Sequence, residues 1–426
     1  MGRGLLILVG GLVIIVGMIQ KSITNRLVLF PERTVNYHQE ADAQNVANSA
    51  MEYGIRELEN NQNWDEGFSS NDFMGAEVTL EIFDYEDYNK NNPDIPPNHN
   101  IENWDQYTAL LVSTAKNKQA EAITEVAVTK NSFSRYTYFT DHEPSNIYFF
   151  DGDVMEGPVH TNGQLKIAGS PVFEGFVSSP NNWQGHSGYQ NDPQFNGGAN
   201  FDSHEIEMPD ASQLNELKSE AQNGGLSFSG EIFVEFKNNG TAAISERQGN
   251  SWGNTITYDL DNYNGVISSS QKIYTKGKLK GQITLHSEDD IEITGDLTYS
   301  TDPTKNTNAS DLLGLVSEKE VIIDKDAHKD TGSKDLEIHG SIMTLDKSFK
   351  VENYRFGDSR GTLKLVGGLQ QKERGPVGTF GNGEIQSGFS KSYSYDSRLM
   401  QINPPFYPRV SVFSEVYWKE KPVEML

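Results

Sequence analysis

The first thirty residues contain no Asp or Glu, and this feature constrains the fold of the chain more than any other. The run from Leu5 to Ile19 has no charged side chain at all. As an α-helix it would be about 22 Å long, which is shorter than the roughly 30 Å of a bilayer core. Continuing the helix to Phe30 reaches the full thickness, and two basic side chains can extend to the surface. The pattern predicts a membrane or assembly helix, formed by Leu5, Leu8, Val9, Leu12, Ile15, Ile19, Leu27 and Phe30, with a kink near Pro31.

Three processing routes are compatible with this segment. A secretory signal needs a small-residue cleavage site after the apolar run, and residues 20–25 offer a poor one. An uncleaved signal anchor is the second route. In the third, the basic and glycine residues of Met1-Gly-Arg-Gly4 resemble the leader of type IV pilin-like proteins, and the resemblance implies a cut between Gly4 and Leu5. The fifth residue after that cut is Val9, where major pilins have Glu, which favours an initiating, tip or accessory subunit.

An amphipathic helix is predicted to follow, ending at the run Asn60-Asn-Gln-Asn63. Apolar and small residues recur there at three- and four-residue steps, namely Ala43, Ala47, Ala50, Met51, Ile55 and Leu58. The stretch from Glu40 to Leu58 resembles the segment that follows the membrane helix in minor pilins of the PilX type. We therefore expect residues 1–60 to form one long helix whose second half packs on its own domain.

From Ala76 the hydrophobic period changes to two. Residues 76–83, 107–113 and 122–129 alternate as strands, and a polar, proline-bearing loop occupies 88–103. A helix followed by a small antiparallel sheet is the usual shape of a pilin head, and also of many unrelated α+β domains. We expect residues 61–135 to form such a domain.

A weak internal repeat marks the remaining chain, predicted as a third domain over 136–426. Alternating apolar residues around a glycine recur at 291–297, 336–342 and 363–369, with a partial copy at 165–169. Short strands joined by glycine bends are typical of a stacked β-solenoid, and a β-sandwich is the alternative. One helix is expected to interrupt the region near 210–222. The predicted fold class is thus α+β, mostly β.

The order of motifs in this third region carries a second resemblance. Three stretches are similar to an uncharacterised domain of bacterial surface and PilX-like pilus-assembly proteins. They run from Asp151 to Phe173, from Asp335 to Met343 and from Arg374 to Thr379. The resemblance implies an exported, pilus-associated protein, and it implies no reaction.

Composition excludes several classes of function. The chain has no cysteine, so a disulfide scaffold, a thiolate metal site and a cysteine nucleophile are excluded. Its formal net charge is −25 and no basic run is present, which argues against a nucleic-acid partner. The 39 glycines and 10% aromatic residues suit a β-rich globular chain.

Candidate chemistry is sparse. Gly249-Asn-Ser-Trp-Gly253 fits the nucleophile-elbow pattern, but the next residues alternate as a strand, so we expect a hairpin turn. His160 and His339 have no partner at metal-ligand spacing and are expected to be packed or surface residues. Asp324, Asp326 and Asp330 alternate before a glycine and form a weak Ca²⁺ candidate, with a solvated loop as the preferred interpretation.

These observations predict a pilin-like structural subunit of a bacterial cell-surface filament or of its assembly machinery. It would be inserted in the inner membrane before assembly and then lie at the cell surface, with other pilin-like subunits or its own copies as partners. No cofactor and no catalysis are expected. The alternatives are an anchored surface β-solenoid that binds or degrades polysaccharide, and an anchored surface protein that never polymerises.

Overall fold

The computed structural model divides the chain into two compact units. The first comprises residues 1–130 and 412–426, and the second comprises residues 131–411. The structure describes residues 2–61, 64–97, 99, 101, 104–211, 214–306, 308–381 and 384–425, and only the backbone of residues 2–8, 25–33, 331, 380, 381, 384 and 425. The predicted division was 1–60, 61–135 and 136–426. The final fifteen residues, which that division placed in the third domain, belong instead to the first unit.

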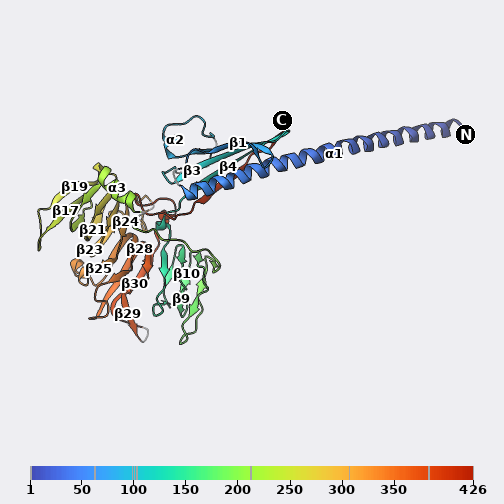
Figure 1. Ribbon diagram of the computed structural model, residues 1–426. Coiled ribbons are helices and arrows are strands. Elements are labelled where there is room, and N and C mark those ends of the chain that lie inside the picture. The colour runs from blue at the N-terminus through green and yellow to red at the C-terminus, as the bar shows by residue number, and fades with distance from the viewer. Residues whose placement is uncertain are drawn as a thin grey trace. The chain divides into compact units, whose positions relative to one another are not determined.

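The first unit combines one long helix with an antiparallel sheet (Figure 1). Its elements are α1 (Gly2–Asn60), β1 (Phe68–Phe73), β2 (Ala76–Phe83), α2 (Tyr85–Asn89), β3 (Thr108–Lys116), β4 (Ala120–Thr129), β31 (Ser414–Glu420) and β32 (Glu424–Met425). The strand order is β1-β2-β3-β4-β31, and β32 also pairs with β4. The helical assignment of α1 continues through Pro31, and the predicted kink there stays a prediction.

Small residues let the second half of α1 approach the sheet closely. Ala43, Ala47 and Ala50 are fully buried and pack against a cluster that includes Ala76, Val78, Ala115, Ala120 and Ala122. Met51 and Leu58, which continue the same helix, pack against Leu80, Leu111, Val126 and Val128. The alternating burial of β2 follows directly from its alternating sequence, since successive side chains point to opposite faces.

The second unit is a β-solenoid. Its earlier strands are β5 (Tyr138–His142), β6 (Phe149–Phe150), β7 (Val154–Met155), β8 (Val159–Thr161), β9 (Lys166–Ala168), β10 (Val172–Phe173), β11 (Val177–Ser178), β12 (Gln184–Gly185), β13 (Gln194–Phe195) and β14 (Ala199–Asn200). The helix α3 (Asn215–Asn223) follows, and its buried residues Leu217 and Ala221 face the core. It begins later than the predicted 210–222, and residues 212–213 lie outside the described part of the chain.

The later strands build the larger part of the solenoid. They are β15 (Leu226–Phe228), β16 (Ile232–Phe236), β17 (Thr241–Gln248), β18 (Ser251–Trp252), β19 (Ile256–Asp259), β20 (Val266–Ser269), β21 (Ile273–Leu279), β22 (Gln282–Ser287), β23 (Ile291–Tyr299), β24 (Leu312–Ser317), β25 (Val321–Ile323), β26 (Leu336–Thr344), β27 (Phe349–Val351), β28 (Ser359–Glu373), β29 (Gly378–Gly381) and β30 (Glu384–Ser394). Short 3₁₀ helices are η1 (Phe133–Arg135), η2 (Leu260–Asn262), η3 (Ala327–Thr331) and η4 (Ser397–Met400).

Parallel pairing between successive rungs defines the solenoid. One long ladder runs in the order β15-β20-β22-β24-β26-β28-β5-β8-β11-β14. In it β28, which belongs to the larger part of the solenoid, stacks on β5, the first strand of the small part formed by β5–β14. A second ladder runs β16-β21-β23-β25-β27, and the small part adds β6-β9-β12 and β7-β10-β13. The predicted fold class, with a solenoid rather than a sandwich, is confirmed.

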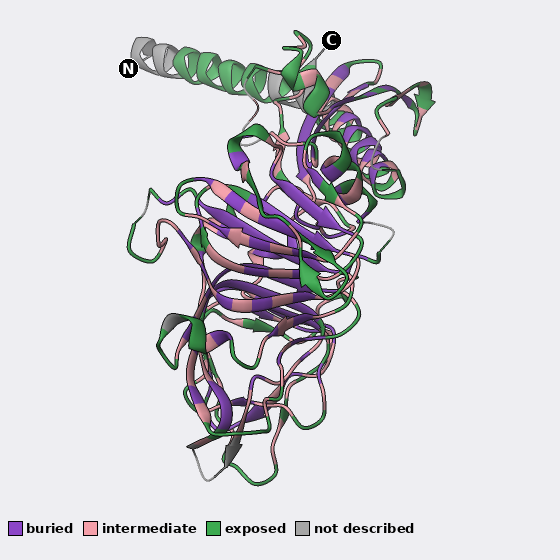
Figure 2. Cartoon of the chain, turned by 90° about the vertical axis from the view of Figure 1, so that its left-hand side faces the viewer, coloured by how far each residue is buried: buried purple, intermediate pink, exposed green. Residues whose placement is uncertain are grey.

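Columns of apolar side chains fill the core between the ladders. Figure 2 shows that the stacked strands of this unit are rich in buried residues. On the long ladder one column runs Ile267, Leu285, Leu315, Ile342, Leu369, Tyr138, Val159 and Val177. On the second ladder the column Ile232, Ile273, Ile291, Val321 and Phe349 ends at β27. Burying each such side chain stabilises the fold by about 1.5–3 kcal/mol, so stacked columns explain how a glycine-rich chain forms a stable unit.

Candidate functional site

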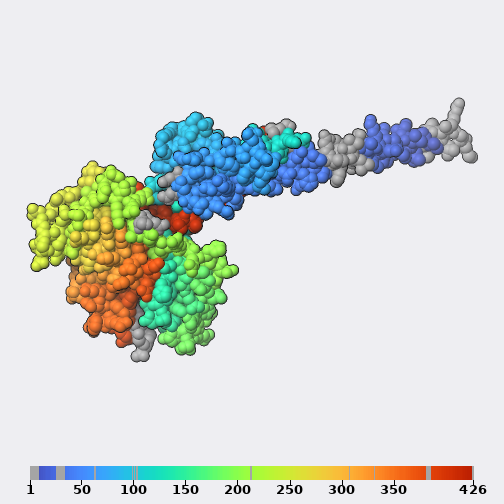
Figure 3. All heavy atoms as spheres, viewed as in Figure 1, coloured from blue at the N-terminus to red at the C-terminus, as the bar shows by residue number. Residues whose placement is uncertain are grey.

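The described N-terminal part of α1 is apolar and uncovered. Its large side chains, each more than half exposed, are Val9, Leu12, Val13, Ile14, Ile15, Val16, Met18, Ile19 and Ile23. Figure 3 shows this part of α1 extending beyond the sheet that its second half contacts. We call residues 9–24 the helix arm. The structure does not describe the side chains at several predicted positions. They are the predicted cleavage site at Gly4 and the predicted helix contacts Leu5, Leu8, Leu27, Phe30 and Pro31.

Among the residues that the structure describes, no helix combines the length and the apolar character needed to cross a membrane.

The second half of α1 is anchored to its own sheet. Ala43, Ala47, Ala50, Met51 and Leu58, which the periodicity assigns to packing, are buried at 0–2% exposure. Ile55 is partly buried against the same core. The two halves of one helix therefore differ completely in their surroundings.

Polar contacts that sequence patterns did not reveal complete this unit. The side chain of Asn48 on α1 donates to Glu420 on β31 at 2.9 Å, and Gln44 donates to Thr124 at 2.8 Å. Glu125 on β4 is almost fully buried, and the ammonium of Lys421 lies 2.6 Å from its carboxylate. The C-terminal segment thus supplies the cation for a buried acid of the first unit.

The Ca²⁺ candidate does not form a ligand cluster. Asp326 pairs with Lys329, and Asp330 pairs with Lys276 at 2.7 Å. Asp324 accepts a hydrogen bond from the backbone N–H of Asp326. Within the described part of the chain, no group of three or more His, Asp or Glu side chains is placed to hold a metal ion.

The two other motifs have structural roles. Arg247 and Gln248 pair with Trp252 and Ser251 across a tight antiparallel turn, so the Gly-x-Ser-x-Gly motif forms the predicted hairpin. His160 is fully buried, with Nδ1 2.8 Å from Ser178 Oγ and Nε2 2.9 Å from Asn162 Oδ1.

His339 is also buried. Its Nε2 lies 2.8 Å from Glu337 Oε1, and its Nδ1 accepts from the Tyr299 N–H at 3.2 Å. Both histidines are packed into the ladders, which is one of the two placements that were predicted.

A cleft of about 830 Å³ opens in the solenoid where the second ladder lacks a strand. The second ladder ends at β27, while the small part restarts with β6, and the long ladder continues unbroken beside them. Phe349 and Phe149, the two facing ends of these stacks, both line the cleft. No sequence pattern indicated this cleft, because it depends on strands more than 200 residues apart.

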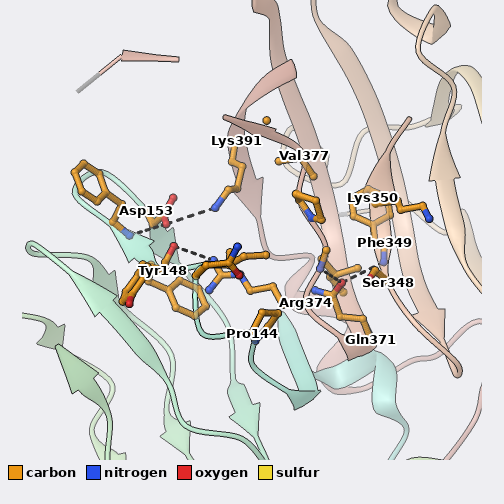
Figure 4. A pocket seen from close by; sticks show the side chains of 18 of the residues that line it. Pro144, Tyr148, Asp153, Ser348, Phe349, Lys350, Gln371, Arg374, Val377 and Lys391 are labelled. Atoms are coloured by element: carbon orange, nitrogen blue, oxygen red, sulfur yellow. Dashed lines mark hydrogen bonds and ion pairs between the residues drawn. The ribbon is translucent and has the colours of Figure 1, made fainter. Parts of the chain in front are cut away.

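Arg374 and Lys391 are two of the four cations that line the cleft (Figure 4), and each has a carboxylate partner, of which Asp153 lies in the lining and Glu143 does not. The guanidinium of Arg374 lies 4.0 Å from the centre of the Phe149 ring and 3.6 Å from the buried carboxylate of Glu143. The ammonium of Lys391 lies 3.7 Å from Asp153. Burial lowers the pKa of Lys391 below its ordinary value, while Asp153 opposes that shift.

Tyr138 and Thr140 anchor the buried acid of this group. The hydroxyl of Tyr138 donates to Glu143 at 2.8 Å, and that of Thr140 donates to the same oxygen at 2.6 Å. Burial raises the pKa of the Tyr138 hydroxyl well above its ordinary value, so it stays a proton donor. Glu143 is therefore fixed as an acceptor behind the cleft wall.

Comparison with known proteins gives limited matches. A family model described as "Domain of unknown function (DUF4900)" matches residues 106–181, from β3 to β11, and gives no specific assignment to the PilX type. No curated protein matches the chain by sequence. Among solved structures, the chain is similar to the competence-associated pilin ComZ from Thermus thermophilus, with a TM-score of 0.33 and 9% identity over 91% of this chain and 98% of that one. A TM-score of this size does not establish a shared fold.

Proposed function

We propose that this chain is a pilin-like structural subunit of a bacterial cell-surface filament or of its assembly machinery. The observation that carries the proposal is the contrast within α1, whose second half is buried on its own sheet while the helix arm is uncovered. Fully burying one Val, Leu or Ile side chain is worth about 1.5–3 kcal/mol, so an uncovered row of them strongly favours association. In this proposal the helix arm is held in the inner membrane first and then packs against neighbouring subunits.

The charge distribution is compatible with this role. All Asp and Glu residues lie beyond Phe30, so the acidic surface belongs to the parts that would stay outside a filament core. Acidic bodies repel one another, and contacts between subunits would therefore be concentrated on the helix arm, which has no carboxylate. Val9 at the position of the pilin Glu favours an accessory or tip subunit. We assign the β-solenoid a display role for adhesion or interaction and no catalytic role.

Mass spectrometry of the N-terminus of the native protein tests the proposal. A mature chain that begins at Leu5 is the expected result. An intact Met1 would instead indicate a membrane anchor that does not polymerise, and a cut near Ser22 would indicate ordinary secretion. Either of these two results would overturn the pilin route.

A further inference from the structure

We propose that the cleft beside the end of the second ladder binds an acidic sugar unit of a polysaccharide, whose carboxylate is held by Arg374 and Lys391. The inference goes beyond the proposed function, since the cleft lies entirely within residues 131–411 and would bind its ligand whether or not α1 assembles.

Arg374 provides a fixed donor that its surroundings do not satisfy. Its side chain is only 5% exposed, and Nη2 donates to the Tyr148 carbonyl at 3.3 Å. Nη1 has no hydrogen-bond partner within the described residues, because Glu143 Oε2 at 3.6 Å is too far for a hydrogen bond. A buried donor left without a partner costs about 1–3 kcal/mol. Nη1 is itself shielded from the cleft, so a bound carboxylate would gain from the charge of Arg374 and from a small rotation of its guanidinium.

Lys391 reaches the same space from a different strand. Its ammonium is 3.7 Å from Asp153 Oδ2, which already accepts from the Phe150 N–H at 2.9 Å. Figure 4 shows Lys391 and Arg374 approaching the cleft from separate elements. The lining also holds the cations Lys350 and Arg355, and four carboxylates, namely Asp151, Asp153, Glu320 and Glu373. Lys350 pairs closely with Glu320, whereas the ion pairs of Arg374 and Lys391 are longer, at 3.6 and 3.7 Å, so these two are the contacts that remain for an anionic group.

The walls suit a ring with one apolar face and a polar edge. Tyr148 and His186 meet edge to face at 4.9 Å, and Phe150 and Tyr189 do so at 5.2 Å. All four line the cleft, and Tyr189 is 48% exposed. A sugar ring can place its C–H face on such a wall while its hydroxyls reach the polar side chains. The volume lies within the range of about 300–1,000 Å³ typical of small-molecule sites.

The strand edges beside the cleft disfavour a peptide. Adding a peptide as a strand requires free backbone N–H groups. The N–H of Phe349 donates to Gln371 Oε1 and that of Val351 donates to the Pro376 carbonyl, both at 3.2 Å. The N–H of Phe150 is taken by Asp153. With these groups occupied, side chains must provide the recognition, which favours a glycan.

Calorimetric titration of the full chain in mild detergent tests the proposal. The probes are trigalacturonate and trimannuronate, the methyl ester of each, and a tetrapeptide with a free carboxylate. We expect at least one acid to bind, its ester to bind roughly 10-fold or more weakly, and added salt to weaken binding, because charged hydrogen bonds dominate.

Lys391→Gln is the decisive variant, since Arg374 variants would leave Glu143 buried without a cation and could unfold. It should weaken binding of the acid roughly 10-fold at an unchanged melting temperature. Lys364→Gln is the matched control on β28, where Lys364 pairs with Asp335 outside the cleft, and it should bind normally. The proposal fails if neither acid binds at millimolar concentration, if the esters bind equally, if only the peptide binds, or if Lys391→Gln has no effect. None of these results bears on where the mature chain begins.

Discussion

Gly340 on β26 and Gly367 on β28 lie directly opposite each other on neighbouring rungs of the solenoid. Their φ angles are 151° and 143°, a region that side chains rarely allow. A β-carbon on Gly367 would lie 2.1 Å from the carbonyl oxygen of Gly340. The two strands can stack here because position 367 is glycine, whereas a β-carbon on Gly340 would meet the carbonyl oxygen of Leu313 on β24 at 3.0 Å.

Gly367→Ala should therefore destabilise the second unit markedly. Gly281→Ala is the matched control, because Gly281 has a φ of 120° but nothing within 4 Å of its added carbon. Both variants introduce backbone strain, and only Gly367→Ala adds a clash with the backbone, which should cost roughly 1–3 kcal/mol more. Differential scanning calorimetry measures the difference, and equal losses would contradict the stacked arrangement.

The glycine pair also shows what the sequence could predict. The repeats at 336–342 and 363–369 are in register in the structure, so their spacing of 27 residues is one turn of the solenoid. The repeat at 291–297 is not in the same register, because Leu297 lies opposite Ile338 rather than Ile342. Loops of different length leave the stack between rungs, and sequence periodicity cannot assign their lengths.

A second prediction concerns the return of the chain to the first unit. Lys421→Met removes the cation 2.6 Å from the buried Glu125 and leaves Lys419 at 3.7 Å. We expect the first unit to lose about 1–3 kcal/mol of stability, because the remaining carboxylate is poorly compensated. The exposed Lys118→Met is the control. Hydrogen exchange of β4 amides reports the change, and unaltered protection would show that the pair is not needed.

This return was invisible in the sequence. No residue of the strand β31 is buried, since three are exposed and four are half-buried, so it carries no alternation of buried residues. Its pairing partner β4 lies nearly 300 residues earlier, and strand pairing over such a separation has no local signal. The packing face of α1, in contrast, was readable because buried residues recur with the helical period.

A third prediction concerns acidification. Burial lowers the pKa of His160, so the folded state favours the neutral ring, while the unfolded chain titrates near pH 6.5. The ring contacts Ser178 and Asn162, and Asn162 in turn donates to Asp141, which is the nearest acid in this network.

The contribution of His160 to the free energy of unfolding is thus fully present above about pH 7. It is lost as the pH falls, with a slope of at most about 1.4 kcal/mol per pH unit. His160→Gln should flatten the dependence of stability on pH between about 7 and 5. Urea unfolding at several pH values provides the comparison. If wild type and variant lose stability in parallel, His160 does not cause the acid sensitivity.

The candidate cleft illustrates the limit of sequence reasoning on function. The two cations assigned to the ligand, Arg374 and Lys391, are separated by seventeen positions and by a hairpin, and the aromatic wall comes from residues 148–189. Only the stacking of β28 on β5 brings these segments together. The helix arm was predictable because its signal is local and continuous, whereas the cleft is a property of the tertiary fold.

Cross-linking through the helix arm tests the central claim most directly. Because the chain has no cysteine, Ile15→Cys introduces a single reactive thiol on the arm, and Asn250→Cys serves as a control at an exposed hairpin of the solenoid. Oxidation in producing cells should link Ile15→Cys into disulfide-bonded dimers with itself, or with a pilin-like subunit that carries a cysteine introduced on its own N-terminal helix, and should leave Asn250→Cys monomeric. An Ile15→Cys chain that stays monomeric under oxidation would contradict the account.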